Sequence, residues 1–121
     1  MEQEDGFFRH NNYKIIKAEK DNVILQAELG KNAMNPYDMA HGGFIFGLGD
    51  TVMGMLVRAC GKRGVTQNAT INFLRPGKGK YITAIGKLIK QGNKTCYARA
   101  DIYDDEEKLI ATMDSNYFII D

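Results

Sequence analysis

One carboxylate stands alone in an apolar segment of this 121-residue chain, because Asp50 is the only charged residue between Gly42 and Val57. An ionised carboxylate in such surroundings loses several kcal/mol of solvation unless it is paired or used in chemistry. The nearest cation along the chain, Arg58, is eight residues further on, beyond the i, i+4 reach of a helical ion pair. Asp50 is therefore the first candidate catalytic group, and a solvated stripe or a distant Lys partner is the alternative.

Residues on either side of this carboxylate could supply hydrogen-bond donors. His41-Gly42-Gly43 precedes the apolar segment, and free amide N–H groups at a helix N-terminus attract negative charge, such as an oxyanion in acyl transfer. Glycine also lets a ligand approach the backbone closely. The alternative is a plain N-terminal turn capped by His41. Asn35 could donate from its side-chain amide or be a turn residue, and Thr66 by itself indicates only a strand.

The elements that would position these residues are one helix and six strands. The segment Gly42–Cys60 is apolar around nearly its whole circumference, which predicts a helix enclosed by other elements. Strands are predicted over residues 13–18, 22–29, 65–74, 80–91, 94–104 and 109–120. Short connections, including an acidic turn at 104–107, favour antiparallel pairing. We therefore predict an α+β fold in which an antiparallel sheet curls around one central helix, whose exposed stripe meets another subunit.

The strand after the helix has a regular alternation. One face would carry Val65, Gln67, Ala69, Ile71 and Phe73, and the other Thr66, Asn68, Thr70, Asn72 and Leu74.

Composition limits the function classes. The length fits a single domain, residues 1–121, with residues 1–12 as a short lead-in. Sixteen Lys and Arg against 15 Asp and Glu argue against a nucleic-acid partner. Two cysteines make no disulfide framework, so we expect a reducing cytoplasm. The acidic first residues lack the apolar core of a secretory signal, and the apolar segment is shorter than a bilayer span, so we expect no membrane partner.

Metal and thiol chemistry have weak support. Two His residues, with Cys60 and Cys96 outside any CxxC spacing, argue against a zinc site, and we expect no metal. A Cys–His pair using His41 is an alternative, although a buried Cys is more often inert packing.

The ordered set Asn35, His41-Gly42-Gly43 and Asp50 resembles the Asn…His-Gly-Gly…Asp signature of the hotdog-fold acyl-CoA thioesterases of the phenylacetate-degradation type. The resemblance continues to the C-terminus through Gly64-Val65-Thr66, Asn72-Phe73-Leu74-Arg75-Pro76, Lys90-Gln91-Gly92-Asn93-Lys94 and Lys108-Leu109-Ile110-Ala111. It implies the hotdog fold, homodimers with two active sites at the interface, and frequent pairing of dimers into tetramers.

The same resemblance implies roles for individual residues. Asp50 would be the catalytic carboxylate, as a nucleophile or as a base on water. The Gly42 amide, with Gly43, would polarise the thioester carbonyl. Asn35 would orient the carbonyl or the water. No cofactor is implied, because CoA is part of the substrate.

Two further positions match the family pattern. By resemblance, His41 would support the turn at the start of the helix. Thr66 stands where the family has a Ser or Thr that helps to position the water.

Helix geometry independently favours a site shared between two subunits. Gly43 and Asp50 are seven residues apart, so the helix separates them by about 10 Å. A carboxylate and oxyanion donors must both lie about 3 Å from one reacting atom. Two such helices packed antiparallel about a two-fold axis meet this condition. We therefore expect acyl-CoA hydrolysis with Asp50 and Thr66 from one subunit and Asn35 and Gly42 from its partner.

Three glycines lower the helix propensity of this segment, by about 1 kcal/mol each relative to Ala. These are Gly47, Gly49 and Gly54, and close helix–helix approach would explain them.

The contacts to substrate are less defined by the sequence. CoA phosphates could be held by Lys62, Arg63, Arg75, Lys78, Lys80 or Lys90, with an ordinary solvated surface as the alternative. An aromatic or medium-chain acyl group could be lined by Phe44, Phe46, Met53 and Met55, although such residues at helical spacing are more often core.

Three rival functions remain open. A hydratase or dehydratase on the same fold usually pairs a His with an acid on the helix, and this helix supplies only Asp50. A non-catalytic acyl-CoA sensor or binding module would bind ligand without releasing thiol. A protein with only an interaction role would have no need of a lone acid in an apolar helix.

Overall fold

Residues 6–120 are described in the computed structural model, and they form six strands and three helical segments. In chain order these are α1 (Gly6–His10), β1 (Tyr13–Glu19), β2 (Asn22–Glu28), the 3₁₀ turn η1 (Lys31–Ala33), α2 (Gly42–Ala59), β3 (Gly64–Phe73), β4 (Tyr81–Gln91), β5 (Thr95–Asp104) and β6 (Leu109–Ile119). The predicted strands and central helix are confirmed, with ends within one residue of those expected. The lead-in contains the short helix α1.

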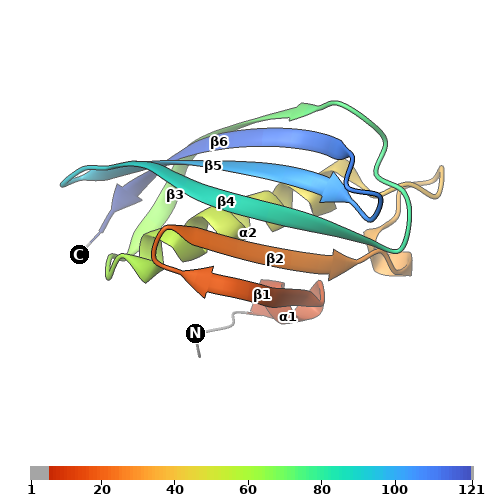
Figure 1. Ribbon diagram of the computed structural model, residues 1–121, viewed down its shortest axis with the longest axis horizontal. Helices are drawn as coiled ribbons and strands as arrows, with labels where there is room; N and C mark the ends of the chain where they lie inside the picture. The colour runs from red at the N-terminus through yellow and green to blue at the C-terminus, as the bar shows by residue number, and fades with distance from the viewer. Residues whose placement is uncertain (1–5, 121) are drawn as a thin grey trace.

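The six strands form one sheet in the order β1-β2-β4-β5-β6-β3, and every neighbouring pair is antiparallel. Consecutive hairpins join β4, β5 and β6, whereas α2 carries the chain from β2 across to β3 at the far edge. Figure 1 shows α2 lying along the inner side of the curved sheet, and α2 contacts all six strands. The predicted α+β architecture is therefore confirmed.

The core lies between α2 and the concave side of the sheet. Fully buried helix residues include Leu48, Val52, Met53, Met55 and Leu56, and they pack against residues such as Leu25, Ile82 and Ile102 of the strands. Burying each large aliphatic side chain contributes about 1.5–3 kcal/mol. Within residues 6–120, no helix combines the length and apolarity needed to cross a membrane.

One stripe of α2 is not covered by the sheet. Gly43 and Arg58 are exposed, and Phe46, Asp50 and Gly54 between them are half-buried. Their spacing of three or four residues places them on one side of the helix. Asp50 therefore lies at the centre of the uncovered stripe.

Two of the helix glycines are explained by contacts within this chain. A Cβ at Gly49 would overlap the Met113 sulfur of β6, and a Cβ at Gly47 would lie 2.9 Å from the Phe7 ring of α1. Bare backbone at these positions lets β6 and α1 pack closely against α2. Helix–helix approach is therefore the wrong explanation for Gly49, whereas Gly47 does face a helix, α1, together with Tyr13 of β1. Gly54 differs, because it lies on the uncovered stripe and a Cβ there would make only ordinary contact.

Candidate active site

Asp50 lies within a cluster of hydroxyl groups. Its Oδ1 accepts a hydrogen bond from Thr66 Oγ1 at 2.8 Å and lies 2.7 Å from Tyr117 Oη. The Tyr117 hydroxyl also lies 2.7 Å from the Asp50 main-chain carbonyl. No hydrogen bond to Oδ2 is recorded within residues 6–120. One carboxylate oxygen is therefore held and the other is available.

Thr66 reaches Asp50 because β3 contains a bulge. Thr66 pairs with Tyr117 and Asn68 pairs with Asn116, so Gln67 has no partner on β6. The regular alternation predicted Thr66 on the same face as Asn68, and this prediction is wrong. The extra residue shifts the alternation and turns Thr66 toward α2, the kind of re-aiming for which bulges are used beside functional sites.

The start of α2 is capped by His41. The His41 Nδ1 accepts a hydrogen bond from the Gly43 amide at 2.8 Å. The Gly43 amide is thus already used, whereas no partner is recorded for the Gly42 amide within the described residues. Gly42 therefore offers the available N–H donor at the positive end of the helix dipole.

Asn35 is fixed in the loop before the helix. Its Oδ1 accepts hydrogen bonds from the amides of Tyr37 at 2.9 Å and Met39 at 3.1 Å. Because the oxygen is occupied, the amide group has its two Nδ2 hydrogens to offer. Asn35 and Gly42 line the same hollow, of about 380 Å³, together with Phe73 and Arg75.

The carboxylate opens into a different hollow. Asp50, Thr66 and Tyr117 line a space of about 500 Å³ whose walls also include Phe7 and Phe46. Neither Asn35 nor Gly42 lines this space. A single chain therefore divides the candidate site residues between two hollows.

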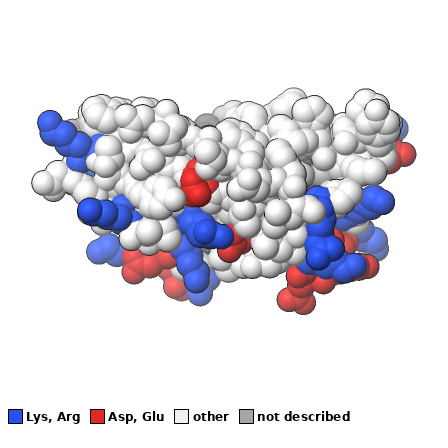
Figure 2. All heavy atoms as spheres, turned by 90° about the horizontal axis from the view of Figure 1, so that it is seen from above, with Lys and Arg blue, Asp and Glu red and all other residues white. Residues whose placement is uncertain are grey.

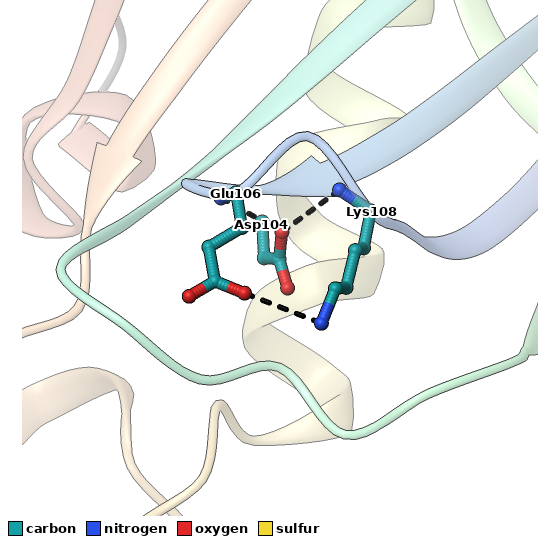
Figure 3. Close-up of polar contacts among 3 residues, drawn as sticks. All are labelled: Asp104, Glu106 and Lys108. Atoms are coloured by element: carbon teal, nitrogen blue, oxygen red, sulfur yellow. Dashed lines mark hydrogen bonds and ion pairs between the residues drawn. The ribbon is translucent and has the colours of Figure 1, made fainter.

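The basic candidates also divide. Arg75 and Lys78 line a cleft of about 340 Å³ whose acidic wall includes Asp104 and Glu106. As predicted, residues 104–107 form a turn: Asp104 Oδ1 accepts from the amides of Glu106 and Lys108, and Lys108 pairs with Glu106 at 3.2 Å (Figure 3).

The remaining basic candidates lie at different places. Lys80 is next to this cleft, because its amide binds Asp105 Oδ2 at 2.8 Å. Lys90 is at the other end of β4, about 30 Å along the strand. Lys62 and Arg63 follow the C-terminal end of α2. The face seen in Figure 2 has basic and acidic side chains intermingled along one side and an uncharged remainder.

The residues proposed for the acyl pocket do not lie together in one place. Phe44, Met53 and Met55 are buried in the core, and only Phe46 lines the hollow beside Asp50. Phe7 of α1, which sequence reasoning did not identify, lines the same hollow.

Tyr117 is the other functional candidate that sequence reasoning missed. Only its place in the alternation of β6 could have indicated it, because this places a polar hydroxyl on the inward face with Met113 and Ser115. Burial, with the neighbouring Asp50 charge as the second cause, raises the pKa of Tyr117 well above its usual value. The hydroxyl therefore stays protonated and acts as a donor.

Thiol and metal chemistry find no support among the described residues. Cys60 caps the C-terminal end of α2, about 28 Å along the helix from His41, so these two cannot form a pair. Cys96 is buried, and burial raises the pKa of its thiol, which disfavours the reactive thiolate. No group of three His, Cys, Asp or Glu residues suited to a metal occurs within residues 6–120.

Comparisons with known proteins agree on one family. The model of the thioesterase superfamily matches residues 37–111. The chain is 27% identical to the acyl-coenzyme A thioesterase PaaI of Escherichia coli over 92% of this chain and 80% of that protein.

Solved structures give the same result. A hypothetical thioesterase from Streptococcus pneumoniae with coenzyme A is 32% identical, with a TM-score of 0.86 over 90% of this chain and 86% of that one. A Streptococcus mutans protein bound to acetyl-CoA is 26% identical, with a TM-score of 0.91 over 99% and 95%. Two variants of the pneumococcal protein replace an Asp and a Thr by Ala, and those positions are 16 residues apart, the separation of Asp50 and Thr66.

Proposed function

Because this chain belongs to the thioesterase superfamily and has its hotdog fold, we propose that it hydrolyses a small or aromatic acyl-CoA to the free acid and CoA. The observation that carries this proposal is the Asp50 carboxylate, which is half-buried on an apolar helix, lines a hollow, and has its Oδ1 held by Thr66 and Tyr117. The matching Asp–Thr separation in the pneumococcal protein supports the choice of Asp50 and Thr66.

The reaction uses donors at one place and a carboxylate at another. The Gly42 amide and Asn35 Nδ2 donate to the thioester carbonyl oxygen and stabilise the negative charge that develops there. Asp50 either attacks the carbonyl carbon through Oδ2 or takes a proton from an attacking water. The C–S bond then breaks and CoA leaves as the thiol. In both routes water supplies the hydroxyl of the released acid.

We propose that two copies of the chain complete the site. β3 is an edge strand without a charged residue, none of its residues is fully buried, and Val65 and Phe73 are about half exposed. Edge strands of monomers are usually protected by charge or covered, so this edge suits pairing with a second copy. Pairing about a two-fold axis brings the Asp50 hollow of one copy toward the Asn35–Gly42 hollow of the other. The dimer then associates further into a tetramer.

Binding of CoA follows from the same arrangement. Arg75 lines the Asn35–Gly42 hollow and also the adjoining cleft that contains Lys78. The Lys80 amide donates to Asp105 of that cleft, so these three cations suit the CoA phosphates. Lys90 would contribute only if the pocket extends along the partner. Because the Gly43 amide serves the His41 cap, Gly43 would contribute a bare backbone surface and no donor.

The acyl group and the cellular location follow from other features. Phe7 and Phe46 give the Asp50 hollow an aromatic wall, which favours a small or aromatic acyl group.

The two free cysteines fit a reducing cytoplasm.

Replacing the carboxylate tests the activity. Asp50→Asn should lower thiol release from a panel of aryl-, short- and medium-chain acyl-CoAs by about 100-fold or more, while the dimer persists in light scattering. Asp114→Asn is the matched control, because Asp114 accepts a hydrogen bond from Thr70 away from the hollow. Near wild-type rates for Asp50→Asn would refute the assignment. Ligand binding without thiol release in the wild type would instead indicate a binding protein.

Mixed dimers test the shared site. Asn35→Ala and Asp50→Ala chains should each retain only a small residual activity alone, but a dimer with one of each retains one intact site. Random mixing should therefore restore about a quarter of wild-type activity. If mixing restores nothing, the two residues act within one chain.

A further inference from the structure

The Tyr117 side chain ties the carboxylate of α2 to the sheet. Tyr117 is 2% exposed, lies opposite Thr66 in the β3–β6 ladder, and places its hydroxyl 2.7 Å from both the carbonyl and Oδ1 of Asp50. These contacts join residues 67 positions apart in the chain. The hydroxyl hydrogen thus lies between two oxygens of one residue.

We propose that Tyr117 is a positioning residue, which together with Thr66 fixes Asp50 Oδ1 so that Oδ2 points at the reacting group. This inference rests on the proposed function, and it assigns Tyr117 a role in setting the catalytic geometry and no direct contact with substrate.

The need for such a residue follows from the place of Asp50. Asp50 is half-buried on the uncovered stripe of α2, and an aspartate side chain that packing does not confine can occupy more than one staggered rotamer. Hydrogen bonds from two donors to the same oxygen restrict the side chain to one rotamer. The contact of the Tyr117 hydroxyl with the Asp50 carbonyl also fixes the carboxylate relative to its own backbone. A displacement of about 1 Å at a reacting group can cost on the order of 100-fold in rate.

Tyrosine suits this task better than a flexible donor would. Its ring has two side-chain torsions and is packed in the sheet, so the position of the hydroxyl is set by β6. The raised pKa of Tyr117 has burial as its main cause and Asp50 as its second, and it keeps the phenol in the donating form. Hydrogen bonds with Thr66 and Ser115 act in the opposite direction, but the net shift of the pKa is upward.

Removing one oxygen atom tests the role. Tyr117→Phe should lower kcat by about 10- to 150-fold, the value of a hydrogen bond to a charged group. KM should change by less than about twofold, because the substrate contacts persist. Tyr97→Phe is the control, because Tyr97 lies on β5 outside the hollow and no hydrogen bond of its hydroxyl is recorded within the described residues. Equal kcat for wild type and Tyr117→Phe would overturn the proposal, as would a loss confined to KM.

A double variant asks whether Tyr117 acts through Asp50. Added to Asp50→Ala, Tyr117→Phe should cause no further loss of kcat, because the carboxylate that it positions is gone. A full additional loss would overturn the proposal and assign Tyr117 an independent role.

A spectroscopic readout does not depend on substrate. With ¹³C-labelled tyrosine, the Cζ chemical shift of Tyr117 near neutral pH should change in Asp50→Ala, since the carboxylate that accepts from its hydroxyl is removed. An unchanged chemical shift would overturn the contact itself. Failure of the proposed function looks different: the wild type would release no thiol from any acyl-CoA, while this chemical shift still changed.

Discussion

The hydrogen bond from Thr66 to Asp50 gives a sharp test of the site, because a matched bond exists elsewhere on the same strand. Thr66→Val replaces the hydroxyl by a methyl group of nearly the same size and removes the 2.8 Å donor to Oδ1. Thr70→Val removes a bond of the same kind, 2.7 Å long, from Thr70 to Asp114. The two variants therefore differ in the carboxylate that loses its partner.

The size of the effect can be worked from the contact. A hydrogen bond to a charged group contributes about 1.5–3 kcal/mol, and each 1.36 kcal/mol in the barrier is tenfold in rate. If the whole bond is lost in the transition state, the rate falls by about 10- to 150-fold. Tyr117 still holds the same oxygen, and Thr66 is exposed in the isolated chain. Both facts favour the lower end, about tenfold.

The assay is steady-state thiol release from the best substrate of the acyl-CoA panel. Thr66→Val should lower kcat, Thr66→Ser should restore it, and Thr70→Val should leave it within about twofold. Denaturant unfolding should show small and similar losses of stability for the two Val variants, since both bonds are at exposed positions. Equal activity losses in Thr66→Val and Thr70→Val would refute the reasoning, because a general effect on β3 would then explain both.

Two further predictions concern stability. Gly49→Ala should lower the free energy of unfolding by about 1–3 kcal/mol, because the new methyl group meets the Met113 sulfur. Gly54→Ala, whose methyl group would make only ordinary contact with the Tyr117 ring, should raise it by up to about 1 kcal/mol. The reverse order in urea unfolding would contradict the packing. Tyr117 should make the free energy of unfolding fall as pH rises above 10.0, the pKa of this tyrosine in the unfolded chain. Above that pH the unfolded chain loses a proton that the folded chain retains. Tyr117→Phe should flatten this decline in unfolding curves measured between pH 8 and 11, and an equally steep decline would count against the buried donor.

The secondary structure followed from local patterns. Alternation in β2, β4 and β5 and the all-round apolar surface of α2 are set by which faces are buried, and burial of period-2 and period-3.6 patterns is the main determinant of element type. The motif Asn35, His41-Gly42-Gly43 and Asp50 could also be recognised from spacing, because all its members lie in one loop and the helix that follows it.

The spacing of residues in the sequence could not show which of the backbone amides at the start of α2 is available to substrate. The sequence suggests that Gly42 and Gly43 act together, but the His41 ring accepts from the Gly43 amide and leaves the Gly42 amide as the available donor. Likewise, the sequence predicted a helix–helix contact at Gly49, but the structure has the Met113 side chain of the sheet packed against this position. Both outcomes depend on the direction of a side chain, which periodicity does not encode.

The sequence by itself determined the order of elements, the central apolar helix and the carboxylate on it, because each depends on residues near one another in the chain. The family resemblance predicted Thr66 at the site of that carboxylate, but only the tertiary structure decided how Thr66 reaches it and that Tyr117 lies beside it. An unpaired Gln67 turns Thr66 inward, and the ladder between β3 and β6 places Tyr117 beside it. A strand register is fixed by pairing between distant segments, so a one-residue bulge is invisible in alternation and yet determines what Asp50 touches.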